Sequence, residues 1–93
     1  MTHIPDENEI KLLRAEVEML MGERDRLLRA VGAAAVFYAR VDPKGLPEKA
    51  LAAAELLTQS LNGVTEDVLQ EAIELVEPEV HAIQSAKRHP GAA

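Results

Sequence analysis

The chain has 93 residues, which is enough for one domain, and Leu, Val, Ile and Ala supply almost all of its apolar side chains. The absence of cysteine excludes disulfides and thiolate metal sites, and the net charge of −6 argues against nucleic acid as the default partner. No apolar run approaches the ~20 residues of a transmembrane helix, and the acidic N-terminus lacks the apolar core of a signal peptide. These features predict a cytoplasmic protein that contacts no membrane, with the Ala-rich, Arg-over-Lys usage of a GC-rich bacterium or its phage.

The first predicted element is a long helix over residues 8–41. Asp6 or Asn8 is its expected cap, and acidic residues occupy the first turn. The helix contains no proline and should end before the turn "DPKGLP" (42–47), because Pro43 disfavours helical geometry at the preceding residue.

Two further helices follow the turn. The second is predicted over residues 47–61 and is ended by Gly63, and the third is predicted over residues 65–88. The apolar face of the third helix continues past Pro78, so that helix should either kink or break there. The predicted class is all-α and the predicted domain is single, covering residues 1–93. A long N-terminal coiled-coil-forming helix is followed by a helical hairpin packed on its C-terminal half.

The long helix carries a heptad pattern typical of a coiled-coil seam. With Ile10 at position a, nine of the ten a and d residues are apolar or aromatic. We call these ten residues the seam: Ile10, Val17, Arg24, Val31 and Tyr38 at a, with Leu13, Leu20, Leu27, Ala34 and Val41 at d. Early β-branched residues at a with leucine at d favour two parallel strands, and Arg14 at e could pair with Glu9 at g of a partner helix.

Helix lengths favour self-association. A 34-residue helix spans roughly 50 Å, whereas the second helix, at ~22 Å, could shield the first only as far as about Leu27. The residues predicted to form the oligomer interface, most simply of a homodimer, are Ile10, Leu13, Val17, Leu20 and Leu27. The alternative is a monomeric three-helix bundle in which the third helix runs along the exposed end of the first.

The stretch "RAVGAAAVFYAR" (29–40) holds the two aromatic residues of the chain, Phe37 and Tyr38. They point about 100° apart on a helix, so both cannot sit at the centre of one narrow seam. Packing against the later helices is the simpler reading of this stretch, but one aromatic side chain could anchor a partner protein. The candidate partner-binding residues are Met21, Arg24, Leu28, Phe37 and Tyr38, with a rim of further arginines at Arg26, Arg29 and Arg40.

Arg24 is the one charged residue at a seam position. It could set the register between strands or hold an anionic partner. Alternatively, its aliphatic stem lies along the seam while the guanidinium sits beside Glu23 or Asp25.

Residues 56–73, "LLTQSLNGVTEDVLQEAI", have the outline of a helix-turn-helix. The helix that would enter the DNA groove exposes Glu66, Asp67, Glu71 and Glu74, which would repel phosphates. The acidic run over 66–79 is therefore expected to be a solvated helix face, with a docking face for a basic partner or a nucleic-acid mimic as the alternatives.

Nothing in the sequence indicates a catalytic, cofactor or metal site, because it has no recognised nucleophile and base pair, glycine-rich phosphate loop or ligand spacing. The predicted function is therefore protein–protein interaction: a self-associating adaptor, or an inhibitor or anti-activator of a larger bacterial protein. A small nucleic-acid-linked regulator or acidic DNA mimic is the alternative.

Overall fold

The computed structural model describes residues 4–88 and contains three α-helices, with no strand in that range. Residues 1–3 and 89–93 of the predicted domain lie outside the described residues. The elements are α1 (Glu7–Arg40), η1 (Pro43–Gly45), η2 (Glu48–Ala50), α2 (Leu51–Asn62) and α3 (Glu66–Arg88), where η denotes a short 3₁₀ turn. The predicted all-α class is confirmed.

Helix α1 begins and ends where local chemistry allows. The Asp6 carboxylate accepts a hydrogen bond from the Glu9 amide at 2.8 Å, which satisfies one of the free donors of the first turn. At the other end Val41 has an extended backbone, with φ −79° and ψ 138°, and its amide donates the last bond to the Phe37 carbonyl. The extended conformation leads directly into Asp42 and Pro43.

Helix α2 begins later than the predicted residue 47. Pro47 is extended, with φ −65° and ψ 150°, and the next three residues form the 3₁₀ turn η2 before α-helical bonding starts at Leu51. Helix α2 ends at Asn62, and Gly63 caps it by donating its amide to the Gln59 carbonyl at 3.2 Å.

Helix α3 runs from Glu66 to Arg88 without a break, although it contains Pro78. Of the two alternatives for this residue, the break into a separate fourth helix is not found. Proline removes one helical hydrogen bond, and the apolar face that continues on both sides of it can offset that loss by packing on α1.

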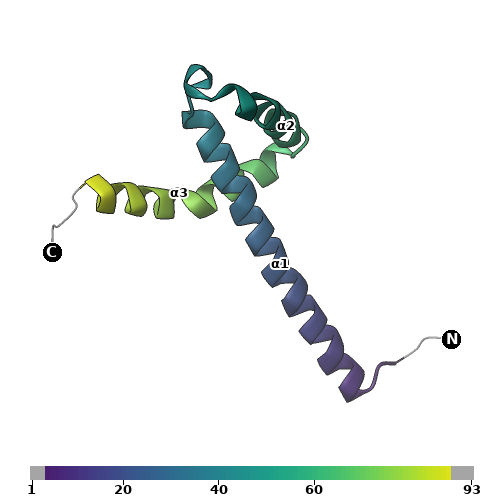
Figure 1. Ribbon diagram of the computed structural model, residues 1–93. Coiled ribbons are helices and arrows are strands. Elements are labelled where there is room, and N and C mark those ends of the chain that lie inside the picture. The colour runs from purple at the N-terminus through teal and green to yellow at the C-terminus, as the bar shows by residue number, and fades with distance from the viewer. Residues whose placement is uncertain (1–3, 89–93) are drawn as a thin grey trace.

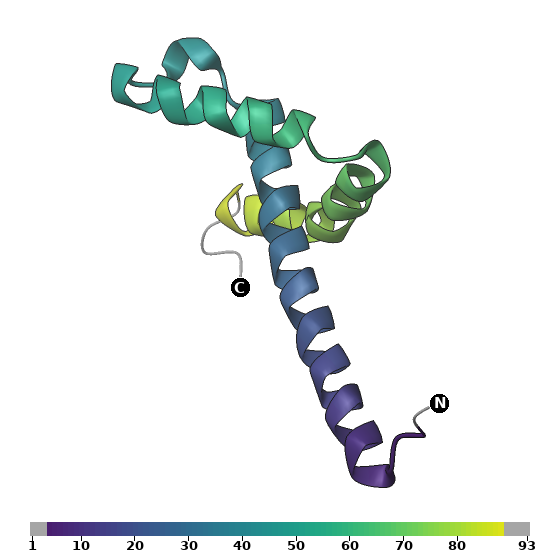
Figure 2. The ribbon, with the colours of Figure 1, turned by 90° about the vertical axis from the view of Figure 1, so that its right-hand side faces the viewer.

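The three helices form an open, extended arrangement (Figures 1 and 2). Helix α3 crosses the C-terminal half of α1 at a steep angle, α2 lies across its C-terminal end, and the N-terminal half of α1 projects away from both. The α2–α3 hairpin therefore packs on the C-terminal half of α1 as predicted, with α3 making most of the contacts. Helix α3 does not run along the N-terminal half of α1, as the bundle alternative required.

The core is small and lies where α1 and α3 cross. Its buried side chains are Leu28, Ala35 and Val36 from α1, together with Ala72 and Val76 from α3. Gly32 is also buried at this crossing, and a Cβ atom placed on it would overlap the Ala72 carbonyl. Below we call residues 7–27 the arm and residues 28–88 the head.

Candidate interaction surface

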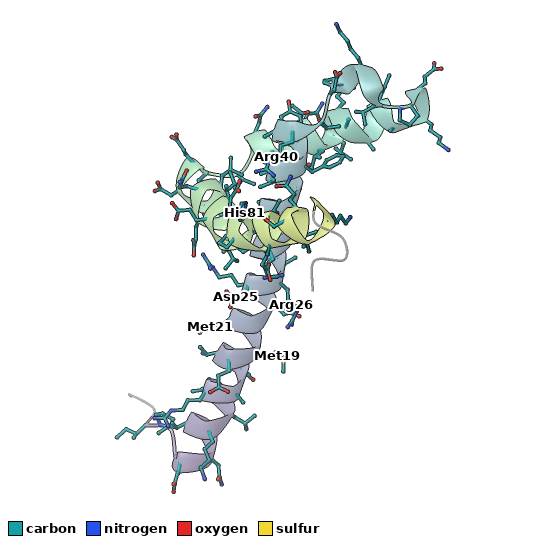
Figure 3. All side chains as sticks on the ribbon, turned by 90° about the vertical axis from the view of Figure 1, so that its left-hand side faces the viewer. Met19, Met21, Asp25, Arg26, Arg40 and His81 are labelled. Atoms are coloured by element: carbon teal, nitrogen blue, oxygen red, sulfur yellow. The ribbon has the colours of Figure 1, made fainter. Side chains whose placement is uncertain are left out.

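The arm has no intramolecular cover along its apolar stripe. Every residue from Ile10 to Met21 is exposed, and the stick view shows the side chains of Met19 and Met21 standing clear of the head (Figure 3). The predicted interface residues share this exposure: Ile10 is 39% exposed, Leu13 and Val17 are 53%, Leu20 is 63% and Leu27 is 68%. Contiguous exposed apolar patches are typical of interaction sites, which makes this stripe the candidate surface.

The contact between α1 and α3 uses a different face of α1 from the seam. Its buried residues are Leu28 and Ala35 at heptad position e, Gly32 at b and Val36 at f. Residues one apart on a helix point 100° apart, so α3 lies beside the a and d positions rather than on them. The intramolecular packing therefore leaves the seam positions up to Leu27, which we call the lower seam, facing outward.

The upper seam, which comprises Val31, Ala34, Tyr38 and Val41, is partly covered by α2. Tyr38 and Val41 line a hollow of about 200 Å³ together with residues from the turn and from α2, among them Leu46, Ala54 and Leu57. Val31, Ala34 and Val41 are half-buried. The predicted seam is thus divided by the fold into an open lower part and an occupied upper part.

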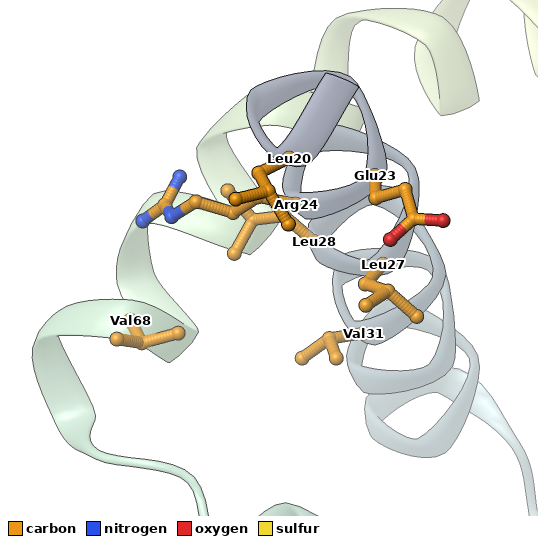
Figure 4. A pocket seen from close by; sticks show the side chains of 7 residues that line it. All are labelled: Leu20, Glu23, Arg24, Leu27, Leu28, Val31 and Val68. Carbon is orange, nitrogen blue, oxygen red and sulfur yellow. The ribbon is translucent and has the colours of Figure 1, made fainter. Parts of the chain in front are cut away.

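A groove of about 420 Å³ lies where the lower seam meets the head (Figure 4). Its walls are mainly apolar and come from both helices: Leu20, Glu23, Arg24, Leu27, Leu28 and Val31 of α1, and Val68 of α3. Leu28, a predicted partner-contact residue, is only 6% exposed and belongs mainly to the core. The groove continues the lower seam toward the head.

Arg24 reaches across to α3 rather than to its sequence neighbours. Its guanidinium donates two hydrogen bonds to the Glu71 carboxylate, at 3.1 and 3.4 Å. The hydrogen bond to Glu71, and then the negative charge of that carboxylate, raise the pKa of Arg24 above its ordinary value. Because Glu71 lies 47 positions along the chain, no local sequence signal could have identified this pair.

Two more ion pairs join α1 to α3. Arg29 lies 2.6 Å from Glu79, and Arg40 lies 3.3 Å from Glu77, with all four side chains about half exposed. The sequence predicts that these acids belong to one solvated face and that these arginines form a rim for a partner. The structure brings them together, so part of the acidic charge of α3 acts within the molecule.

The two aromatic side chains are both substantially exposed at the end of α1. Phe37 is 58% exposed and Tyr38 is 44% exposed. Both line the hollow against α2, and Phe37 also borders a shallow cleft with Val80 and Gln84 of α3. Neither ring is enclosed by the core, so both remain accessible to another molecule.

Within residues 4–88, no helix is long and apolar enough to cross a membrane. The same part of the chain holds no group of three or more His, Cys, Asp or Glu side chains that could bind a metal ion. No protein-family model, curated protein or solved structure matches the chain.

Proposed function

We propose that the protein is a self-associating protein–protein interaction module in which copies pair through the lower seam of α1. The observation that carries this proposal is the outward-facing apolar stripe of Ile10, Leu13, Val17, Leu20 and Leu27 on a helix that projects from the head. Most helical stability in proteins comes from packing of an apolar face, so a second helix on this stripe would stabilise the arm.

The proposal extends to a second protein. The exposed side chains of Met21, Phe37 and Tyr38 lie outside the lower seam and would remain available to a larger bacterial protein. The dimer would act on it as an adaptor, an inhibitor or an anti-activator. A cytoplasmic setting is part of the proposal and rests on the cysteine-free composition.

The self-association is tested by placing charge on the seam. Val17→Glu with Leu20→Glu removes apolar contacts worth roughly 1.5–3 kcal/mol for each fully buried side chain and places carboxylates at the interface. We expect light scattering to give a dimer mass for the wild type and a monomer mass for the variant. The head should stay folded in both, because Val17 and Leu20 are exposed and neither belongs to its buried core.

The matched control is Leu12→Glu with Met19→Glu, which adds the same two charges to exposed apolar positions on another face of the arm. This control should remain dimeric. A monomeric wild type, or equal dissociation of the two double variants, would refute pairing through the lower seam.

A further inference from the structure

We infer that the second copy lies antiparallel along the lower seam, with the first turns of its α1 in the groove beside Val68. This inference rests on the proposed self-association and deepens it. The occupant of the exposed seam is thereby a defined segment, residues 7–27 of another copy.

A parallel second copy would collide with α2. A straight, in-register parallel copy would carry its own residues 31–41 along the upper seam, and α2 already lies over that face at Tyr38 and Val41. An antiparallel copy avoids the upper seam, because its own residues 31–41 lie beyond the N-terminal end of the first chain's α1, and it meets the head only at the groove beside Val68. The β-branched residues at a and the leucines at d indicate how many strands assemble when a coiled coil is parallel. They do not decide the orientation here, because a parallel copy would still meet α2.

One antiparallel register pairs the apolar residues of the lower seam with each other. In antiparallel pairs, a residues face d residues. Pairing Ile10 with Leu27 of the second copy also pairs Val17 with Leu20, and each pair occurs twice. Leu13 then lies against the aliphatic stem of Arg24, whose guanidinium is drawn aside by Glu71. This register covers every exposed apolar residue of the lower seam.

The groove lies where the first turns of the second copy's α1 would fall. In this register Ile10 of the second copy lies opposite Leu27, at the apolar groove bordered by Val31 and Val68. The groove of about 420 Å³ can accept an aliphatic side chain and part of the helix that carries it. The head therefore provides an end wall for the second helix.

Charge along the arm points the same way. Residues 6–18 contain five acidic and two basic side chains, whereas residues 19–30 contain two acidic and three basic ones. Parallel pairing would place two acidic ends side by side, and antiparallel pairing separates them. Arg24 and Arg29 are already paired with Glu71 and Glu79, so they add little attraction for the acidic end of the second copy. The main electrostatic gain of antiparallel pairing is therefore the lower repulsion between the two acidic ends. One cost remains, because Glu16 would lie near Glu23 of the second copy, and exposed pairs of this kind contribute little.

Single-cysteine variants test the orientation, because the natural chain contains no cysteine. Ile10→Cys and Leu27→Cys, one of them carrying an affinity tag, are mixed, equilibrated and oxidised. Antiparallel pairing should give mostly the mixed disulfide, because two cysteines at the same position in the two chains would lie ~26 Å apart along the helix axis. Leu12→Cys mixed with Leu27→Cys is the control and should give little product.

A charge variant tests the same geometry without cysteine. Glu23→Lys would place a lysine near Glu16 of the second copy in the antiparallel pair, whereas in a parallel pair it would lie near Leu28. We expect the dimer dissociation constant to fall roughly three- to tenfold at low salt. Glu18→Lys, with the same change in net charge at heptad position b, should have a smaller effect.

The outcomes separate the two levels of the hypothesis. A monomeric wild type would refute the self-association itself. A dimer in which Ile10→Cys and Leu27→Cys each cross-link to their own kind, or in which Glu23→Lys binds no tighter than Glu18→Lys, would overturn only the antiparallel arrangement.

Discussion

Gly32 is the residue on which the crossing of α1 and α3 depends. A Cβ on this glycine would overlap the carbonyl oxygen of Ala72. It would also lie 2.7 Å from the carbonyl carbon of Ala72 and 3.0 Å from Cγ2 of Val76. Two of these atoms are backbone and cannot move without shifting α3. The small residue is therefore needed for the close approach of the helices rather than for a special backbone conformation.

Gly32→Ala should therefore destabilise the head despite the better helix propensity of alanine. We expect a loss of about 1–3 kcal/mol in the free energy of unfolding, as for overpacking in other cores. Circular dichroism during denaturant unfolding, at fixed protein concentration, measures this change.

Gly22→Ala is the matched control, because the nearest atom to its added Cβ is the flexible Arg26 side chain at 3.7 Å. It should stabilise α1 by roughly 0.5–1 kcal/mol. Equal effects at the two glycines would contradict the close approach at Gly32.

At the scale of elements, the two halves of α1 are stabilised by different contacts. Residues 28–40 are held by α3 and α2, whereas the arm is held by its Asp6 cap, its own helical bonds and, near its end, the Arg24–Glu71 ion pair. Most helical stability in proteins comes from packing of an apolar face, and the apolar stripe of the arm is exposed. Its helicity should therefore depend on association in a way that the head's does not.

Dilution should reveal this difference. At protein concentrations below the dimer dissociation constant, the arm should lose its helical structure. The magnitude of the ellipticity at 222 nm should then fall in proportion to the fraction of helical residues that lie in the arm. Thermal unfolding of the head should persist. Val17→Glu with Leu20→Glu should show the reduced signal at all concentrations. Helicity that stays constant on dilution to the monomer would mean that the arm is stable alone.

As a whole molecule, the protein is far from compact. Its radius of gyration is 19.6 Å and its extents are 62 × 41 × 24 Å, whereas a compact domain of this length has a radius near 12 Å. Five apolar side chains form the core of residues 4–88, which is few for that length. Such a chain buries little apolar surface alone, so dimerisation would contribute a substantial part of its stability.

Small-angle X-ray scattering should show the overall form of the dimer. With antiparallel arms, the two crossings near Gly32 would lie about 40–45 Å apart along the shared axis, at 1.5 Å per residue. The pair-distance distribution should therefore contain two peaks, one within each head and one between heads. A single broad peak from two adjacent heads would indicate parallel arms.

The sequence by itself determined the helices and the stripe on α1. The capping role of Asp6, the end of α1 before Pro43 and the heptad positions from Ile10 to Leu27 depend on residues within a few positions of each other. Such local patterns are readable because helical geometry is regular. The later start of α2 was missed because Pro47 is compatible both with a first helical turn and with the extended backbone that it adopts.

Only the tertiary structure decided how the seam is shared. Three contacts join residues distant in the chain: Gly32 with Ala72, Arg24 with Glu71, and the partial cover of Tyr38 by α2. Periodicity shows that a helix has an apolar face, but it does not give the angle at which another helix crosses it. The crossing angle depends on which side chains at the contact are small enough for close approach. Here α3 crosses α1 steeply and does not run along the arm, so the lower seam stays exposed.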